Sequence, residues 1–369
     1  MDKVALVAIT KHGIEHVRQL KKRMANADVY YMKKHAKGDE EELGITLFEG
    51  SVRLQMEHFF KEYDGIVFVI SLGAVVRMIA PHLKDKKVDP AVVVIDDKGE
   101  YVISVLSGHI GGANELTKMV ARELQAQPVI TTASDVQQTI PVDIFGREYG
   151  WIIEDFTHVT PVSASVVNEE PIVIVQESGE TGWWKHKRNL PSHMKVVHSC
   201  EEALGETFHA ALLITHRVLD ADRYKDLLSA SVIYRPKTIH LGVGCNRGTS
   251  AEEIQQVIDE TLLELELSSL SVNGISTIDL KSDEEGLQKV CKDNNWSFTY
   301  YTPEQLNKQP MKNPSETVYK YTGAYGVSEP AALLSAGTDE LYLEKKKSGN
   351  VTVSIGISQH HAKELQRKV

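Results

Sequence analysis

Apolar runs typical of β-strands alternate with segments of helical spacing at both ends of this chain, and no other feature of the sequence constrains the fold as strongly. Residues 4–10, 65–70 and 101–106 are predicted strands, and each precedes a segment with apolar residues at helical spacing. The same pattern resumes at residues 239–243. Strands that alternate with helices form layered α/β sheets. The sequence therefore predicts an α/β module at each end of the chain.

The stretch between these modules has a different character. Its short β-like runs are separated by polar loops, and one loop carries a Trp-Trp-Lys-His-Lys-Arg cluster at residues 183–188. This cluster either stacks on a flat ligand or packs its own tryptophans on an exposed loop. A chain of 369 residues is too long for one ordinary core. We therefore predict a multi-domain α/β protein: an N-terminal layered α/β domain (1–136), a small α+β middle domain (137–236) and a C-terminal α/β domain (237–369).

Composition argues against several classes of protein. The net charge of −10 disfavours a general nucleic-acid binder, and an anionic ligand would need a local basic patch. No apolar run approaches the length that spans a bilayer, and the apolar stretch at residues 4–9 lacks the cleavage site of a signal peptide. The three cysteines are far apart and form no metal or redox motif, as expected in a reducing compartment. We expect a cytoplasmic protein with no nucleic-acid or membrane partner.

A glycine-rich turn at residues 106–115 connects a predicted strand to a predicted helix. It holds three glycines together with Ser107, His109, Asn114 and Glu115. Glycines let the backbone approach a ligand closely, and the unpaired N–H groups at a helix start can bind an oxyanion. Ser107, His109 and Glu115 are therefore candidates for an acid, a base or a nucleophile. The alternative is that Ser107 or Asn114 only caps the helix.

The motifs of several common enzyme classes are missing from the sequence. The chain has no G-x-S-x-G elbow, which argues against a serine-hydrolase triad. The glycine-rich turn lacks the G-x-G-x-x-G spacing, and no G-x-x-x-x-G-K-[ST] loop occurs. A dinucleotide-binding fingerprint is therefore not present, and ATP use is not supported.

Turns follow three of the predicted N-terminal strands, at residues 71–73, 107–109 and 131–135. Ligands bind at the carboxyl ends of strands in α/β sheets, so all three turns are candidates for ligand binding. Arg77 follows the first turn on a short apolar helix and is a candidate clamp for a carboxylate. The nearby lysines are interpreted as a solvated face.

A second glycine-rich turn, at residues 242–250, leads into a predicted helix with a capping box formed by Ser250 and Glu253. This turn is either an anion cradle or simply a tight turn into a capped helix. Cys245 lies on it, where the helix N-terminus and Arg247 would lower the pKa of the thiol. The alternative for Cys245 is ordinary packing.

Five motifs, taken in their order along the chain, resemble those of one known family. Residues 71–77, 104–114 and 131–135 resemble the N-terminal module of the CbiG family, and residues 241–250 and 325–334 resemble its C-terminal module. That C-terminal module is similar to the stand-alone CobE protein, and the divergent middle stretch suits the linking module of the family. CbiG proteins are the cobalt-precorrin-5A hydrolases of anaerobic cobalamin (vitamin B12) biosynthesis.

The resemblance implies a hydrolase that acts on a cobalt-bound, ring-contracted tetrapyrrole. The δ-lactone on ring A of cobalt-precorrin-5A is opened and a two-carbon fragment leaves as acetaldehyde, so that a carbon–carbon bond is cleaved with water and cobalt-precorrin-5B is formed. Cobalt arrives with the substrate, so no cofactor and no protein-held metal are expected. The alternative is a non-catalytic corrinoid-binding carrier that hands intermediates between pathway enzymes. These enzymes, and a second copy of the chain in a homodimer, are further candidate partners.

Catalytic roles within this resemblance fall on the first glycine-rich turn. His109 or Glu115 would act as a general base, and Ser107 is the third catalytic candidate. The N–H groups around Gly111 and Gly112 would hold the oxyanion of the opening lactone.

Substrate-binding roles within the resemblance are spread over both end modules. Arg77 and Arg247 would clamp peripheral carboxylates of the macrocycle. The other candidate contacts are glycines and polar residues of the matched motifs: Gly73, Gly108, Asn114, Thr132, Asp135, Gly244, Cys245 and Glu329.

Overall fold

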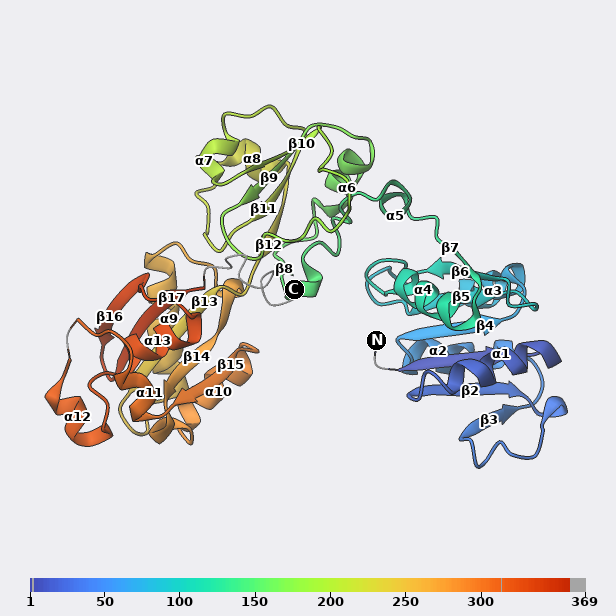
Figure 1. Ribbon diagram of the computed structural model, residues 1–369, viewed down its shortest axis with the longest axis horizontal. Coiled ribbons are helices and arrows are strands. Elements are labelled where there is room, and N and C mark those ends of the chain that lie inside the picture. The colour runs from blue at the N-terminus through green and yellow to red at the C-terminus, as the bar shows by residue number, and fades with distance from the viewer. Residues whose placement is uncertain (2, 313, 359–369) are drawn as a thin grey trace. The chain divides into compact units, whose positions relative to one another are not determined.

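The computed structural model describes residues 1, 3–312 and 314–358 (Figure 1). The chain divides into two compact units, Met1–Ile144 and Phe145–Val369. Within the described ranges, no helix combines the length and apolar character needed to cross a membrane. The predicted multi-domain α/β class is confirmed.

The first unit is built on one sheet, which among the described residues has seven strands in the order β3-β2-β1-β4-β5-β6-β7. The strands are β1 (Val4–Ala8), β2 (Ala27–Met32), β3 (Ile45–Phe48), β4 (Gly65–Val69), β5 (Ala91–Ile95), β6 (Tyr101–Leu106) and β7 (Gln127–Val129). The helices are α1 (Lys11–Lys21), α2 (Met56–Glu62), α3 (Leu72–Ile79), α4 (Ala113–Leu124) and α5 (Ala133–Gln137).

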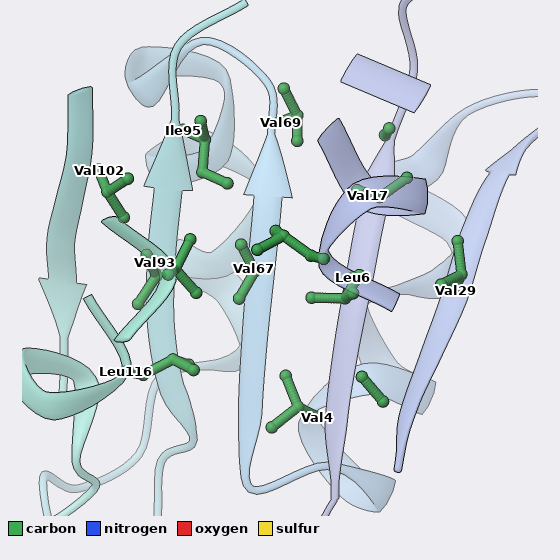
Figure 2. Packing of buried hydrophobic residues seen from close by; sticks show 14 of the residues in the cluster. Val4, Leu6, Val17, Val29, Val67, Val69, Val93, Ile95, Val102 and Leu116 are labelled. Atoms are coloured by element: carbon green, nitrogen blue, oxygen red, sulfur yellow. The ribbon is translucent and has the colours of Figure 1, made fainter. Parts of the chain in front are cut away.

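Both faces of this sheet are covered by apolar side chains. On one face Leu6, Val67 and Val93 pack beneath Val17 of α1 and Leu116 of α4 (Figure 2). The opposite face packs against α2 and α3. Every residue of β1, β4 and β5 is therefore buried, which explains why these strands are continuous apolar runs in the sequence.

The direction of the strands in this sheet reverses between β5 and β6. Strands β1 to β5 pair in parallel. A hairpin then makes β6 antiparallel to β5, with Leu106 opposite Val92 and Val102 opposite Ile95. The Asp-Asp-Lys-Gly sequence at residues 96–99 is typical of a hairpin turn and predicts this connection, which is confirmed. Strand β7 is parallel to β6, so both end at the edge where β4 and β5 begin.

The three candidate turns therefore lie at different edges of the sheet. Residues 71–73 follow β4, whereas residues 107–109 and 131–135 follow the reversed strands β6 and β7. The first turn is separated from the other two by a strand length, about 16 Å for five residues. Each turn lies at the carboxyl end of its own strand, but the reversal of β6 and β7 prevents all three from meeting.

The described residues of the second unit form two sheets. The first has the order β10-β9-β11-β12-β8 among the residues described. Its strands are β8 (Ile152–Ile153), β9 (Ile172–Gln176), β10 (Met194–Val197), β11 (Ala210–Ile214) and β12 (Ser231–Arg235), and its helices are α6 (Val159–Val167), α7 (Cys200–Ala203) and α8 (Lys225–Ser229). Strands β9 to β12 pair in parallel and β8 joins antiparallel. The middle domain is thus of α/β type, and the α+β expectation for it is wrong, because the chain returns through crossovers to start each parallel strand.

The other sheet of the second unit has the order β15-β14-β13-β17-β16 in the described part of the chain. Its strands are β13 (Ile239–Cys245), β14 (Val272–Ile278), β15 (Ser297–Tyr301), β16 (Leu343–Ser348) and β17 (Val351–Ile357). The helices are α9 (Ala251–Glu264), α10 (Glu285–Asp293), α11 (Pro303–Asn307), α12 (Glu316–Thr322) and α13 (Ser328–Ala336). The apolar runs at residues 341–343 and 351–357 predict a closing antiparallel pair, which is confirmed, although β16 starts at Leu343, where the first run ends.

Helix starts in this module differ from the predicted caps. Ser250 accepts a hydrogen bond from the Glu253 N–H, but the Glu253 carboxylate binds the Asn350 N–H, so only half of the predicted capping box forms. Ser282 and Glu285 have the spacing of a second capping box, but helix α10 begins after Glu284, which makes no side-chain cap. The Glu253 carboxylate thus binds Asn350, a loop residue, instead of the backbone N–H of the N-cap.

The two sheets of the second unit are joined by short backbone pairing. Arg217 forms a β-bridge with Leu267, and the Val218 N–H donates to the Glu266 carbonyl at 2.7 Å. Each sheet of the chain lies inside one of the three predicted modules. The compact units divide the chain only after Ile144, so both module boundaries, at 136/137 and at 236/237, stay predictions.

Candidate active site

The turn between β6 and α4 has the tight geometry expected of it. Ser107 adopts a φ of 57° and Gly112 a φ of 83°. Gly112 is the N-cap of α4 and no side chain caps the helix, so the capping alternative for Ser107 and Asn114 is wrong. The Ser107 hydroxyl instead donates to the Asp89 carbonyl at 2.9 Å. A Cβ on Gly111 would lie 2.4 Å from the Ser107 Cβ, so the turn requires glycine there.

His109 is the centre of a cluster of polar side chains. Its Nδ1 lies 2.9 Å from Asp143 Oδ1, and its Nε2 lies 3.0 Å from Asp135 Oδ2 and 3.1 Å from the Ser134 hydroxyl. The His109 side chain is 13% exposed. Two carboxylates therefore face the two nitrogens of a largely buried imidazole ring.

This environment favours the charged form of the ring. Hydrogen bonds to Asp135 and then Asp143 raise the pKa of His109 to about 9. The same contact with His109, assisted by Lys118, lowers the pKa of Asp135 to about 2. At neutral pH His109 is therefore an imidazolium and a poor general base. It is better suited to donate a proton or to stabilise negative charge.

Asn114 is buried behind this cluster and links three segments. Its amide nitrogen donates to Thr132 Oγ1 and Asp135 Oδ2, both at 2.9 Å, and its oxygen accepts from the Ser104 hydroxyl at 2.7 Å. A Cβ on Gly108 would lie 2.9 Å from Asn114 Oδ1. The two turns predicted after β6 and β7 thus meet, with Asn114 holding Asp135 against His109.

Three backbone N–H groups at the end of the turn form hydrogen bonds within it. Gly112 N–H donates to the His109 carbonyl, Ala113 N–H to the Ser107 carbonyl and Asn114 N–H to the Gly108 carbonyl, at 2.9 to 3.0 Å. The Gly112 N–H is therefore engaged within the turn and does not face a substrate oxyanion, contrary to expectation. The His109 cation is the stronger candidate for that role.

Glu115 lies at the exposed rim of the site. Its carboxylate is 78% exposed and pairs with Lys118 at 2.7 Å. Lys118 also lies 3.3 Å from Asp135 Oδ1. Glu115 is therefore connected to the His109 cluster only through a lysine and a second carboxylate.

The other candidates of the first unit are separate from this cluster. Gly73 and Arg77 lie on the opposite edge of the sheet, where the Arg77 guanidinium donates to the Gly73 carbonyl at 3.0 Å. A group on the substrate in contact with His109 cannot at the same time contact Arg77.

In the second unit, carboxylates of the chain itself bind the polar groups of the second glycine-rich turn. Glu284 is buried and accepts from the Gly248 N–H at 2.7 Å, and exposed Arg247 pairs with Asp283 at 2.6 Å. Burial raises the pKa of the Cys245 thiol, and Arg247 opposes this only weakly, so the expected lowering is wrong. This geometry favours the tight-turn interpretation over an anion cradle.

Gly244 and Glu329 complete the candidates of the second unit. A Cβ on Gly244 would lie 2.7 Å from Thr352 Oγ1, so this glycine allows close packing between strands. Glu329 is buried and accepts from the Lys345 N–H at 3.2 Å. Both residues have structural partners within their own module.

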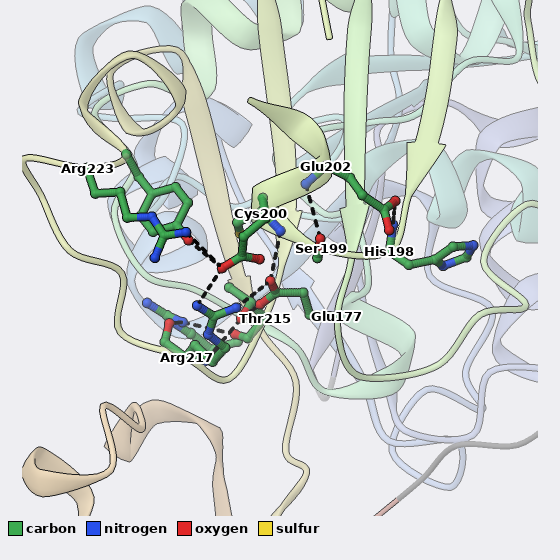
Figure 3. Close-up of polar contacts among 11 residues, drawn as sticks. Glu177, His198, Ser199, Cys200, Glu202, Thr215, Arg217 and Arg223 are labelled. Atoms are coloured by element: carbon green, nitrogen blue, oxygen red, sulfur yellow. Dashed lines mark hydrogen bonds and ion pairs between the residues drawn. The ribbon is translucent and has the colours of Figure 1, made fainter. Parts of the chain in front are cut away.

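A second polar cluster lies at the carboxyl edge of the middle sheet (Figure 3). Glu177, 7% exposed, accepts hydrogen bonds from the Cys200 N–H, the Thr215 hydroxyl and the Arg217 guanidinium. Arg235 is buried nearby and pairs with Glu154. A carboxylate of the chain thus occupies the edge where ligands of parallel sheets bind, and its contacts stabilise the fold.

The 183–188 cluster packs largely against its own module. The Trp183 indole donates to Gln176 Oε1, and its ring lies 5.3 Å from that of Phe145 at an interplanar angle of 84°. The Trp184 indole donates to the Arg188 carbonyl within the loop. These contacts favour the alternative in which the loop packs its own tryptophans.

Sequence reasoning missed Asp143, Ser134, Lys118 and Ser104. Ser134 lay inside a turn already singled out, and Lys118 follows Glu115 by one helical turn. Asp143 is 34 residues from His109 in a segment without regular structure, and nothing in its spacing indicates the contact.

His109 makes the stability of the first unit dependent on pH. Its pKa is raised from 6.5, so the His109 ion pairs stabilise the fold fully below pH 6.5 and are lost as the pH rises through 9. We expect the difference in unfolding free energy between wild type and His109→Gln to shrink by about 2 kcal/mol across this window, after allowance for solvent screening. Urea unfolding at a series of pH values measures it. A constant difference would contradict the pairing.

Three family models match the chain in consecutive order. "Cobalamin synthesis G N-terminal" matches residues 55–135, "Cobalamin biosynthesis central region" residues 140–236, and "Cobalamin synthesis G C-terminus" residues 239–356. Together the matches run from residue 55 in the first unit to the last described strand, β17.

Three curated relatives share sequence with the chain. A cobalt-precorrin-5A hydrolase from Priestia megaterium is 59% identical over 353 residues, which cover 96% of this chain and 94% of the relative. A cobalt-precorrin-5A hydrolase from Salmonella typhimurium is 30% identical over 333 residues, 86% of this chain and 88% of the relative. The protein CobE from a Sinorhizobium species is 29% identical over 118 residues, 31% of this chain and 77% of CobE.

Proposed function

This chain belongs to the CbiG family of cobalamin biosynthesis, and from that premise we propose that it is a cobalt-precorrin-5A hydrolase that acts at the His109 site. The observation that carries the activity is the 59% identity to a hydrolase of that name over 96% of the chain. The resemblances predicted from the sequence motifs, to CbiG proteins and to CobE, are confirmed.

The chemistry of the implied reaction suits the charge of this site. Attack of water on a lactone places negative charge on the carbonyl oxygen, and cleavage of a carbon–carbon bond passes through an alkoxide. A fixed cation in a partly dehydrated site stabilises such charges. His109, held as an imidazolium between Asp135 and Asp143, supplies this cation and a transferable proton.

Both ring nitrogens of His109 already contact a carboxylate. His109 therefore donates to a substrate oxygen only when that oxygen replaces one of the two carboxylates. Asp135 is held independently by Asn114 and Lys118 and stays in place during this exchange. The proposal includes no resident cofactor, because cobalt arrives with the substrate. We further propose that the reaction takes place in the cytoplasm. The proposed partners are other enzymes of the pathway and a second copy of the chain, which would form a homodimer.

Acetaldehyde release tests the activity. Purified protein mixed with cobalt-precorrin-5A is expected to form one acetaldehyde per substrate consumed, together with a change in the corrinoid absorbance. Binding that shifts the absorbance without acetaldehyde would contradict the hydrolase and favour the non-catalytic carrier. Protein omitted from the mixture is the control for spontaneous lactone opening.

A further inference from the structure

Asp143 reaches the His109 site from outside the N-terminal family module. The matched N-terminal region ends at residue 135 and the matched central region starts at residue 140, yet Asp143 lies in the first compact unit. Its neighbours Ile140 and Val142 are 4% and 2% exposed. The segment next to Asp143 is therefore buried, and it belongs to the first compact unit.

The two carboxylates that contact His109 are held in different ways. Asp135 shares Nε2 with the Ser134 hydroxyl and is itself bound by Asn114 and Lys118. Asp143 contacts the other nitrogen, Nδ1, at 2.9 Å with its side chain only 16% exposed. A carboxylate removed from water at this distance is a strong partner for an imidazolium and determines which way the ring faces.

We propose that Asp143 is a positioning residue of the active site, which holds His109 by Nδ1 so that its Nε2 edge carries the chemistry. This inference rests on the proposed function of the His109 site. It makes the segment that enters the second unit an integral part of that site, so that a module ending at residue 136 would lack a component of it.

The charges around His109 give the proposal a measurable signature. The ring faces Asp135 from α5 and Asp143 from the connecting segment, and Lys118 and Glu115 of α4 lie behind Asp135. Asp143→Asn keeps the shape of the side chain and removes one of the two facing negative charges. The pKa of His109 then moves toward its ordinary value of 6.5.

Asp143→Asn tests the proposal with two readouts. We expect the His109 ring signals in NMR to titrate at least about one pH unit lower than in wild type, and the alkaline limb of the kcat/KM profile to move with them. We expect kcat to fall at least about tenfold while KM changes less than about threefold. Asp143→Glu, which keeps the charge, is expected to restore the titration and most of kcat.

Asp97→Asn is the matched control. Asp97 pairs with His12 at 3.0 Å in the same unit, on the opposite edge of the sheet and in a more exposed position. This variant is expected to leave the His109 titration and kcat unchanged.

Each outcome decides one of the two proposals. A wild-type His109 titration in Asp143→Asn overturns the positioning role, whatever the activity. If Asp143→Asn does not fold, Asp143→Glu decides. A His109 pKa far below the wild-type value in Asp143→Glu overturns the positioning role, and a His109 pKa close to the wild-type value supports it. If wild type releases no acetaldehyde, the proposed function fails, while the titration still tests the contact.

Discussion

His109→Gln lowers kcat for acetaldehyde release by about 10²- to 10⁴-fold, the range for loss of a positioned proton donor. Glutamine retains hydrogen-bonding capacity toward Asp135 and Asp143 but carries no charge and no titratable proton. If His109 stabilises charge that develops only during the reaction, KM changes little while kcat falls. Acetaldehyde formation, followed through its reduction by alcohol dehydrogenase and NADH, measures both constants.

His12→Gln is the matched control for this variant. His12 also pairs with an aspartate, Asp97, but it is 75% exposed and lies on the opposite edge of the sheet. Its replacement is expected to leave kcat within about threefold of wild type. A wild-type kcat for His109→Gln, or an equal loss for His12→Gln, would place the reaction away from the His109 site.

Gly242→Ala lowers the free energy of unfolding of the second unit by about 3 kcal/mol or more, or prevents the C-terminal sheet from forming. An added Cβ would lie 1.8 Å from the Ser328 carbonyl oxygen and 2.7 Å from the Ala332 nitrogen. Both are backbone atoms of α13, which packs directly on β13. No side chain can move to relieve this contact, so the helix itself must shift.

Gly182→Ala is the control for the loss of a glycine. Among the described residues, no heavy atom that could clash lies within 4 Å of the position of its Cβ. We expect its unfolding free energy to stay within about 0.5 kcal/mol of wild type. Urea unfolding monitored by circular dichroism compares the two variants. Equal stability of Gly242→Ala and wild type would contradict the close packing of α13 on β13.

Much of the fold was predictable because its strands are short, buried and apolar. The β-branched and aromatic residues at 297–301 predict a strand that agrees at both ends with β15, Ser297–Tyr301. The hairpin between β5 and β6 follows from its turn residues. The predicted α+β character of the middle domain was wrong. The direction of strand pairing depends on crossovers between residues far apart, and local patterns do not encode it.

The reversal of β6 and β7 shows the limit most clearly. The turn at residues 96–99 indicates that β6 runs back along β5. Whether β6 also joins the same sheet as β1 and β4 depends on packing of the whole unit. Since β6 does join this sheet, the turn at 107–109 lies a strand length from Arg77. The motifs at 71–77 and 104–114, which were predicted to form one site, are therefore separated.

The sequence by itself determined the family, the α/β patterns of the two end modules and the turn that carries His109, because these depend on short-range spacing and on motifs within a few residues. Only the tertiary structure decided that Asp135 and Asp143 both face His109, that Asn114 holds Asp135, and that Gly112 donates within its own turn. Those contacts join residues up to 34 positions apart. The charge of the histidine is set by the two carboxylates that packing brings to it, so its role as a cation is a property of the folded chain.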